Sequence, residues 1–126
     1  MEWALEAALP ENAKFIGREV NGELVGAFGF VNYTGDGGDI EVLVAGNRPG
    51  WLSLPLMRAV WRYVWDVCGC RRASARVRVS NTKQLEYMER WGFQREGLMR
   101  EAYCGNGKTV EDMVVFGILR SESKHG

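Results

Sequence analysis

The segment 80–97 constrains the fold more than any other part of the chain. It follows a stretch of alternating apolar and polar residues, opens with Asn81 as a helix cap, and runs for about three helical turns. Gly92 ends the helical pattern, and Phe93 begins a new extended segment. The sequence therefore predicts a strand, a capped helix and a second strand in immediate succession.

The preceding residues predict a further helix and strand. Between residues 54 and 68 the apolar side chains recur at helical spacing, and Gly69 is a natural stop; the apolar set is Met57, Val60, Trp61, Val64, Trp65 and Cys68. Residues 73–80 then alternate with period two, which is typical of a half-buried strand. Together with a strand at 39–44, this order predicts a strand–helix–strand unit.

Turn signals complete the order of elements. Asn21-Gly22 separates strand-like runs at 13–20 and 23–34 and favours a type I′ hairpin, and Gly105-Asn106-Gly107 separates strands at 93–104 and 110–119. A short helix is expected at 2–9, ending at Pro10. The order is α-β-β-β-α-β-α-β-β in a single domain, 1–126, with the short helix in 1–12 and a polar tail at 121–126.

Composition excludes several classes of function. The formal net charge is 0 and the pI is about 6.6, so no global field favours nucleic acid or an acidic membrane. The longest apolar-plus-glycine run, 24–31, is far shorter than the roughly 20 residues of a membrane span. The start Met1-Glu2-Trp3 has no basic region typical of a secretory signal, so a cytoplasmic location is predicted.

Metal and histidine chemistry are also disfavoured. The chain has three cysteines, Cys68, Cys70 and Cys104, and one histidine, His125, in the polar tail. A zinc site needs about four such ligands in fixed geometry, so no metal is expected and the thiols are predicted to be reduced. A histidine-based nucleophile is excluded in the same way. Any catalytic base would be a carboxylate, a water or the substrate itself.

This order of elements resembles the GNAT superfamily of N-acetyltransferases, nearest to the subgroup that acetylates protein N-terminal amines. The resemblance is carried by Asn81, by Gly92-Phe93 and by Glu96-Gly97, which follow that subgroup's pattern. It implies the acyl-CoA N-acyltransferase fold, an α/β (α+β) architecture with a mixed, mostly antiparallel sheet, a central parallel strand pair and two main helices. It also implies acetyl-CoA as co-substrate and a primary amine, either a protein N-terminus or a small amine, as acceptor.

The resemblance also implies a coenzyme A loop before the first long helix. In the family, a loop of the type Q/R-x-x-G-x-G/A presents backbone N–H groups to the pyrophosphate at a helix N-terminus. Two registers are open here: either Arg48 takes the first motif position and Trp51 the first glycine position, or Gly50 is the first glycine and Leu52 replaces the second. The paired glycines are absent in both. The expected cofactor contacts are Val44, Arg48, Gly50, Trp51, Leu52 and Ser53.

Two positions around the second helix are implied by the same resemblance. Asn81 is expected both to cap the helix and to lie near the pantetheine arm. The family tyrosine that protonates the departing thiolate corresponds to Met88, which cannot donate a proton. Tyr87 lies one residue earlier, about 100° around the helix, and is the candidate substitute.

The predicted base is a carboxylate on the third strand. Asp39 and Glu41 share one face of that strand; Glu41 is the first choice and Asp39 the second. A solvated strand face is the simpler interpretation of both. Glu96 and Glu101 are further candidates on the closing hairpin.

The family places a strand and about two helices ahead of residue 13, where this chain has only about a dozen residues. The acceptor side would then be open, trimmed or completed by another subunit, so a homodimer is predicted. The alternative function is a catalytically idle acetyltransferase-fold module for binding or assembly. A nucleic-acid role would depend only on Arg71, Arg72, Arg76 and Arg78 and is not expected.

Overall fold

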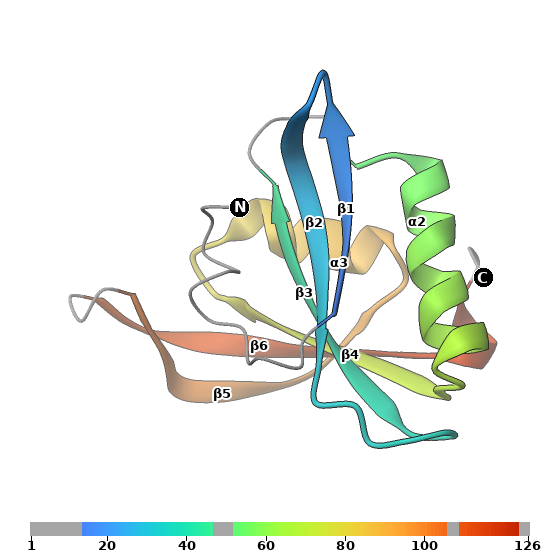
Figure 1. Ribbon diagram of the computed structural model, residues 1–126. Coiled ribbons are helices and arrows are strands. Elements are labelled where there is room, and N and C mark those ends of the chain that lie inside the picture. The colour runs from blue at the N-terminus through green and yellow to red at the C-terminus, as the bar shows by residue number, and fades with distance from the viewer. Residues whose placement is uncertain (1–13, 47–51, 106–108, 124–126) are drawn as a thin grey trace.

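A computed structural model describes residues 14–46, 52–105 and 109–123 (Figure 1). Its strands are β1 (Lys14–Val20), β2 (Glu23–Val31), β3 (Asp39–Gly46), β4 (Arg72–Arg78), β5 (Gln94–Gly105) and β6 (Thr109–Leu119). The helices are α2 (Leu54–Trp61), continued by a π-helical segment (Arg62–Val67), and α3 (Thr82–Arg90); a 3₁₀ turn (Arg120–Glu122) follows β6. The helix expected at 2–9 lies outside the described residues.

The six strands form one mixed sheet in the order β1-β2-β3-β4-β6-β5. Only β3 and β4 are parallel; the other neighbouring pairs are antiparallel. This arrangement confirms the predicted mixed sheet with a central parallel pair and two helices. Within the described residues no helix combines the length and the apolar character that crossing a bilayer requires.

The first hairpin follows its turn residues. Asn21 and Gly22 have φ values of 53° and 81°, as a type I′ turn requires. β2 ends at Val31, three residues before the predicted end at 34, because Asn32 has a φ of 55° and cannot continue a strand. The following loop is closed by Thr34, whose N–H donates to the Asp39 carbonyl over 3.0 Å.

One face of the sheet carries the core. Both helices pack their apolar sides into a single buried cluster with this face, and Trp61 and Trp65 stack at 5.2 Å between ring centroids. The helix expected at 54–68 is α-helical only to Trp61. The turn after it widens, and the Cys68 N–H donates to the carbonyl of Tyr63, five residues back, over 2.8 Å.

The opposite face of β3 and β4 is polar. Its members are Asp39, Glu41, Arg72, Ser74 and Arg76, which alternate with buried apolar residues along the same strands. Glu41 is the buried charged residue of this set; only 8% of it is exposed. The sheet therefore separates an apolar core from a charged surface at its parallel centre.

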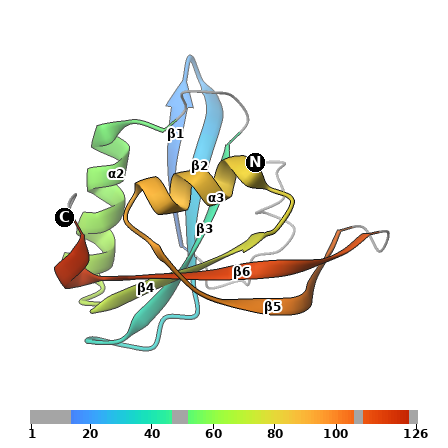
Figure 2. The same ribbon diagram turned by 180° about the vertical axis from the view of Figure 1, so that it is seen from behind.

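The β5–β6 hairpin extends beyond the body on the side away from α2, as both views show (Figures 1 and 2). β5 is an edge strand and is exposed along most of its length. Its register against β6 shifts twice, between Arg95 and Gly97 and between Met99 and Tyr103. The second shift is a larger bulge, in which residues 100–102 lie opposite Asp112 alone and Glu101 has a φ of 53°.

Candidate functional site

The parallel strands separate soon after they begin. β3 and β4 pair only at Asp39–Arg72, Ile40–Ala73 and Glu41–Ser74. Beyond this point β3 stays paired with β2 as far as Gly46, and β4 stays paired with β6 as far as Arg78. Alternate N–H and C=O groups after Glu41 therefore face the gap without a strand partner.

A groove of about 240 Å³ occupies this gap. Its walls come from the separated strand ends, the start of α3 and the β5–β6 hairpin, and its lining residues are Val42, Leu43, Val44, Ala75, Arg76, Val77, Arg78, Asn81, Gln84, Met88, Tyr103 and Met113. The lining is mostly apolar with a few polar groups, as in binding sites for small organic molecules.

The groove brings together two of the predicted cofactor contacts, Val44 and Asn81. Asn81 is also the N-cap of α3, as predicted, because its Oδ1 accepts a hydrogen bond of 3.3 Å from the Gln84 N–H. Arg48, Gly50 and Trp51 lie outside the described residues.

The last two predicted cofactor contacts mark the start of α2. Ser53 is its N-cap, and its Oγ accepts a hydrogen bond of 3.3 Å from the Leu56 N–H. Leu52 is half-buried against the core cluster. Pro55 lies in the first turn, where its missing N–H leaves no intrahelical bond unmade. Ser53 thus has an extended backbone and caps the start of α2, an arrangement that favours an anion.

Tyr87 does not reach the groove. Its ring stacks on Trp91 with centroids 5.9 Å apart and planes at 10°, and the Arg90 guanidinium lies 5.7 Å from the ring centroid. Met88, the next residue around the helix, lines the groove instead. The angular offset seen in the sequence is therefore enough to direct Tyr87 elsewhere.

Glu41 lies at the last paired position before the strands separate. Its Oε1 accepts hydrogen bonds from Asn32 Nδ2 (2.8 Å) and Arg76 Nη2 (3.0 Å), and its Oε2 accepts one from Arg76 Nε (3.1 Å). Only 10% of the carboxylate side chain is exposed. Three elements thus converge on a buried anion whose Oε2 keeps one lone pair free.

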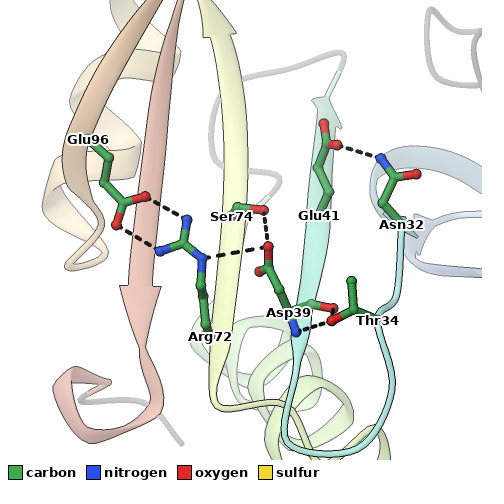
Figure 3. A network of polar contacts seen from close by, with 7 residues as sticks. All are labelled: Asn32, Thr34, Asp39, Glu41, Arg72, Ser74 and Glu96. Carbon is green, nitrogen blue, oxygen red and sulfur yellow. Dashed lines mark hydrogen bonds and ion pairs between the residues drawn. The ribbon is translucent and has the colours of Figure 1, made fainter.

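Asp39 lies two residues earlier on the same face, within a network of polar contacts (Figure 3). Its Oδ2 accepts a hydrogen bond of 3.2 Å from Ser74 Oγ and lies 3.6 Å from Arg72 Nε. Arg72 also forms a two-point pair with Glu96, at 2.8 and 2.6 Å. Hydrogen bonds from Arg72 lower the pKa of Glu96; burial opposes this shift, and the arginine charge adds to it.

The two predicted bases face different openings. Asp39 lines a wider opening of about 760 Å³ at the start of the parallel pair, together with Thr34, Gly37, Gly38, Arg71, Arg72, Leu119, Arg120 and Ser121. Glu41 lies instead beside the groove, through its partner Arg76. Among the described residues, no group of three or more side chains could hold a metal ion.

Arg76, Arg78 and Tyr103 line the groove but were not among the sequence-predicted site residues. Arg78 Nη1 donates to the Tyr103 hydroxyl over 3.3 Å, and its guanidinium lies 5.1 Å from the ring centroid. The alternation of Arg76 and Arg78 with buried residues could have placed both on one strand face. Tyr103 gave no such signal, because its position depends on the bulge in β5.

Comparison with solved structures shows which fold this is. The chain matches a crystal structure described as a probable acetyltransferase with a TM-score of 0.76 and 23% identity, covering 89% of this chain and 64% of that one. It also matches a variant of the spermidine N-acetyltransferase SpeG from Vibrio cholerae, with a TM-score of 0.72 and 21% identity, covering 88% of this chain and 68% of that one.

A chimera of SpeG with hSSAT gives a TM-score of 0.73 at 19% identity, covering 86% of this chain and 68% of the chimera. No protein-family model and no curated protein sequence matches the chain. The chain has the acetyltransferase fold. It spans about three fifths to two thirds of the length of the first solved structures that it matches.

Proposed function

We propose that this domain binds acetyl-CoA in the groove between β3 and β4 and transfers its acetyl group to a primary amine. The separation of the parallel strands after Glu41 is the observation that supports this proposal most directly. It leaves strand-edge donors and acceptors beside an apolar slot. Those groups suit the amides of a pantetheine arm, and a free N–H can polarise the thioester carbonyl.

The pyrophosphate would bind at the start of α2. The capped helix terminus at Ser53 supplies the local dipole, and Arg48, Gly50 and Trp51 are the proposed contacts before it, with Leu52 beside them. Val44 and Asn81 would then contact the pantetheine arm. Acetyl-CoA supplies the activated acetyl thioester.

The acceptor amine would approach from the polar face of the sheet. Its nitrogen must be neutral to attack, so a proton has to leave it. Glu41 is the proposed acceptor of that proton, directly or through one water, by the free lone pair of Oε2. Asp39 is the second candidate. Protein N-termini and small amines both remain acceptors to be tested.

A homodimer is also proposed. Trp61, Trp65 and Trp91 are buried in the core and give no surface for self-association. The exposed edge strand β5, with Leu98 56% exposed, gives a second copy a surface to pair with. Light scattering at tens of micromolar should give about twice the monomer mass of 14.2 kDa; a monomer alone would remove this part of the proposal.

Calorimetry with acetyl-CoA and CoA, followed by a thiol-release assay with a panel of amines, tests the function. Val44→Trp should fill the groove and abolish binding. Val67→Trp is the matched control, because Val67 is 70% exposed and is not among the groove-lining residues. Binding without turnover for any amine would favour the idle binding module instead. Absence of binding to the wild-type protein would refute the cofactor site.

A further inference from the structure

We propose that Tyr103, on the β5–β6 hairpin, is the group that protonates the coenzyme A thiolate as it leaves, with Arg78 as its supporting cation. The inference rests on the proposed function and assigns one of its steps to a residue outside α3. Four observations support it: the β5 bulge, the Arg78 contact, the space at Gly105, and the chemistry of the groove lining.

The bulge moves Tyr103 toward the groove. Met99 is opposite Met113, so an unbroken antiparallel register would place Tyr103 opposite Thr109 at the hairpin tip. The structure places it opposite Glu111 instead, two positions nearer the body. At about 3.4 Å per residue this is a displacement of roughly 7 Å.

The bulge itself is fixed by a specific contact. The N–H of Glu101, whose φ is 53°, donates to Asp112 Oδ1 over 2.8 Å. A non-glycine residue in this conformation carries backbone strain, which persists where surrounding contacts determine it. Bulges commonly re-aim side chains beside functional sites, and Tyr103 is the side chain re-aimed here.

Arg78 contacts the Tyr103 side chain, and Gly105 leaves room for its ring. An arginine can only donate, so in the 3.3 Å contact with Arg78 the phenol oxygen is the acceptor and its own O–H remains free to donate. A Cβ at Gly105 would come within 2.9 Å of ring atom Cε2 and 3.0 Å of the hydroxyl oxygen. Glycine at this position leaves the space that the ring occupies.

Among the groove-lining residues of the described chain, Tyr103 alone carries a transferable proton of suitable acidity. The others are apolar residues, amides and the two arginines, whose protons are held too tightly. Phenols and thiols have ordinary pKa values of about 10 and 8.5, so transfer from the phenol to the thiolate is uphill by a factor of only about 30 in the equilibrium constant. Arg78 stabilises the phenolate that is left.

The step balances as follows. The amine nitrogen forms a bond to the acetyl carbon, the carbon–sulfur bond breaks, and its electron pair goes to sulfur. The Tyr103 O–H proton then passes to sulfur and gives the free thiol. Glu41 or a water takes up the proton that the amine loses and releases it to solvent. The Tyr103 phenolate regains a proton from solvent before the next turnover.

Tyr103→Phe tests the assignment with two readouts. Loss of the acid should lower kcat by about 10²-fold while KM for acetyl-CoA stays within a few-fold, and the alkaline limb of the pH profile should disappear. Without turnover, the ratio of CoA to desulfo-CoA affinity, measured by calorimetry, should fall about three- to tenfold, because one hydrogen bond to sulfur is lost. Tyr33→Phe is the matched control and should change neither readout.

Gly105→Ala gives a second approach, since the added methyl displaces the ring; it should reproduce the loss of kcat. Full kcat and an unchanged pH profile in Tyr103→Phe would overturn the inference while the proposed function stands. A loss found instead in Tyr87→Phe would return the role to α3. If the wild-type protein acetylates no amine, the proposed function fails. In that case an unchanged ratio of CoA to desulfo-CoA affinity in Tyr103→Phe would also refute the contact between Tyr103 and the sulfur.

Discussion

Arg76 holds the buried carboxylate of Glu41 at two points, with Nε 3.1 Å from Oε2 and Nη2 3.0 Å from Oε1, where β3 and β4 separate. Asn32 supplies the third hydrogen bond to this carboxylate. The pair therefore ties β3 to β4 at the end of their short common ladder. It also fixes the position of the proposed base.

Arg76→Gln should destabilise the domain. The Glu41 carboxylate would lose its paired cation and keep the hydrogen bond from Asn32, in a site that is nearly shielded from water. Breaking a fully buried ion pair costs about 3–5 kcal/mol, and because Arg76 is 40% exposed we expect about 1–3 kcal/mol. Urea unfolding measures the change. Arg95→Gln, which breaks an exposed pair with Glu89, should cost about 0.5 kcal/mol or less; equal losses would contradict the argument.

Glu41→Gln should slow turnover by about 10²–10⁴-fold, because the amide cannot accept the amine proton. Affinity for acetyl-CoA should stay within a few-fold of wild type. Steady-state kinetics with the best amine of the panel, together with calorimetry, makes the comparison. Asp39→Asn is the matched variant: if it carries the loss while Glu41→Gln is fully active, the two roles are reversed.

Asn81→Asp should separate the two functions of this residue. Aspartate caps a helix as well as asparagine does, so the free energy of unfolding should change by less than about 0.5 kcal/mol, whereas Asn81→Ala should lose about 1 kcal/mol. Both variants remove the side-chain amide and should weaken acetyl-CoA binding. Unchanged affinity in Asn81→Asp would show that the residue is a cap only.

The Arg72–Glu96 pair predicts a dependence of stability on acid. The folded state lowers the pKa of Glu96 from its ordinary 4.5, chiefly through hydrogen bonds from Arg72. The stabilisation is therefore present above pH 4.5 and is lost as the pH falls through the lowered value. Melting temperatures between pH 7 and 2 should fall less steeply for Glu96→Gln than for wild type. Glu89→Gln, which removes one carboxylate from an exposed pair, is the matched control for charge.

The fold was predictable because its elements depend on local signals. The spacing of Val60, Trp61, Val64 and Trp65 defines a buried helix side, and all four are buried. The turn at Asn21-Gly22 depends on the backbone conformation of these two residues, and the helix cap at Asn81 depends on its own side chain. The widened turn after Trp61 was not predictable, since it depends on which carbonyl the Cys68 N–H selects.

The candidate site was predictable only in part. Val44 and Asn81 were placed by the order of strands and helices, which the sequence indicates. Tyr87 was expected to substitute for Met88, yet one residue of helical rotation turns it onto Trp91. The position of Tyr103 depends on the register between β5 and β6. The bulge shifts that register by two positions, so side chains stay on the same faces and the sequence pattern does not reveal the shift.

The second bulge in β5 bears on which parts of this hairpin can change in length. The contact between Glu101 and Asp112 fixes the bulge on the body side of Tyr103, and Gly105 leaves room for its ring. The tip beyond Gly105 can thus be lengthened, shortened or replaced without moving the phenol. A hairpin of this construction separates a fixed part, which positions the phenol, from a tip whose length can change.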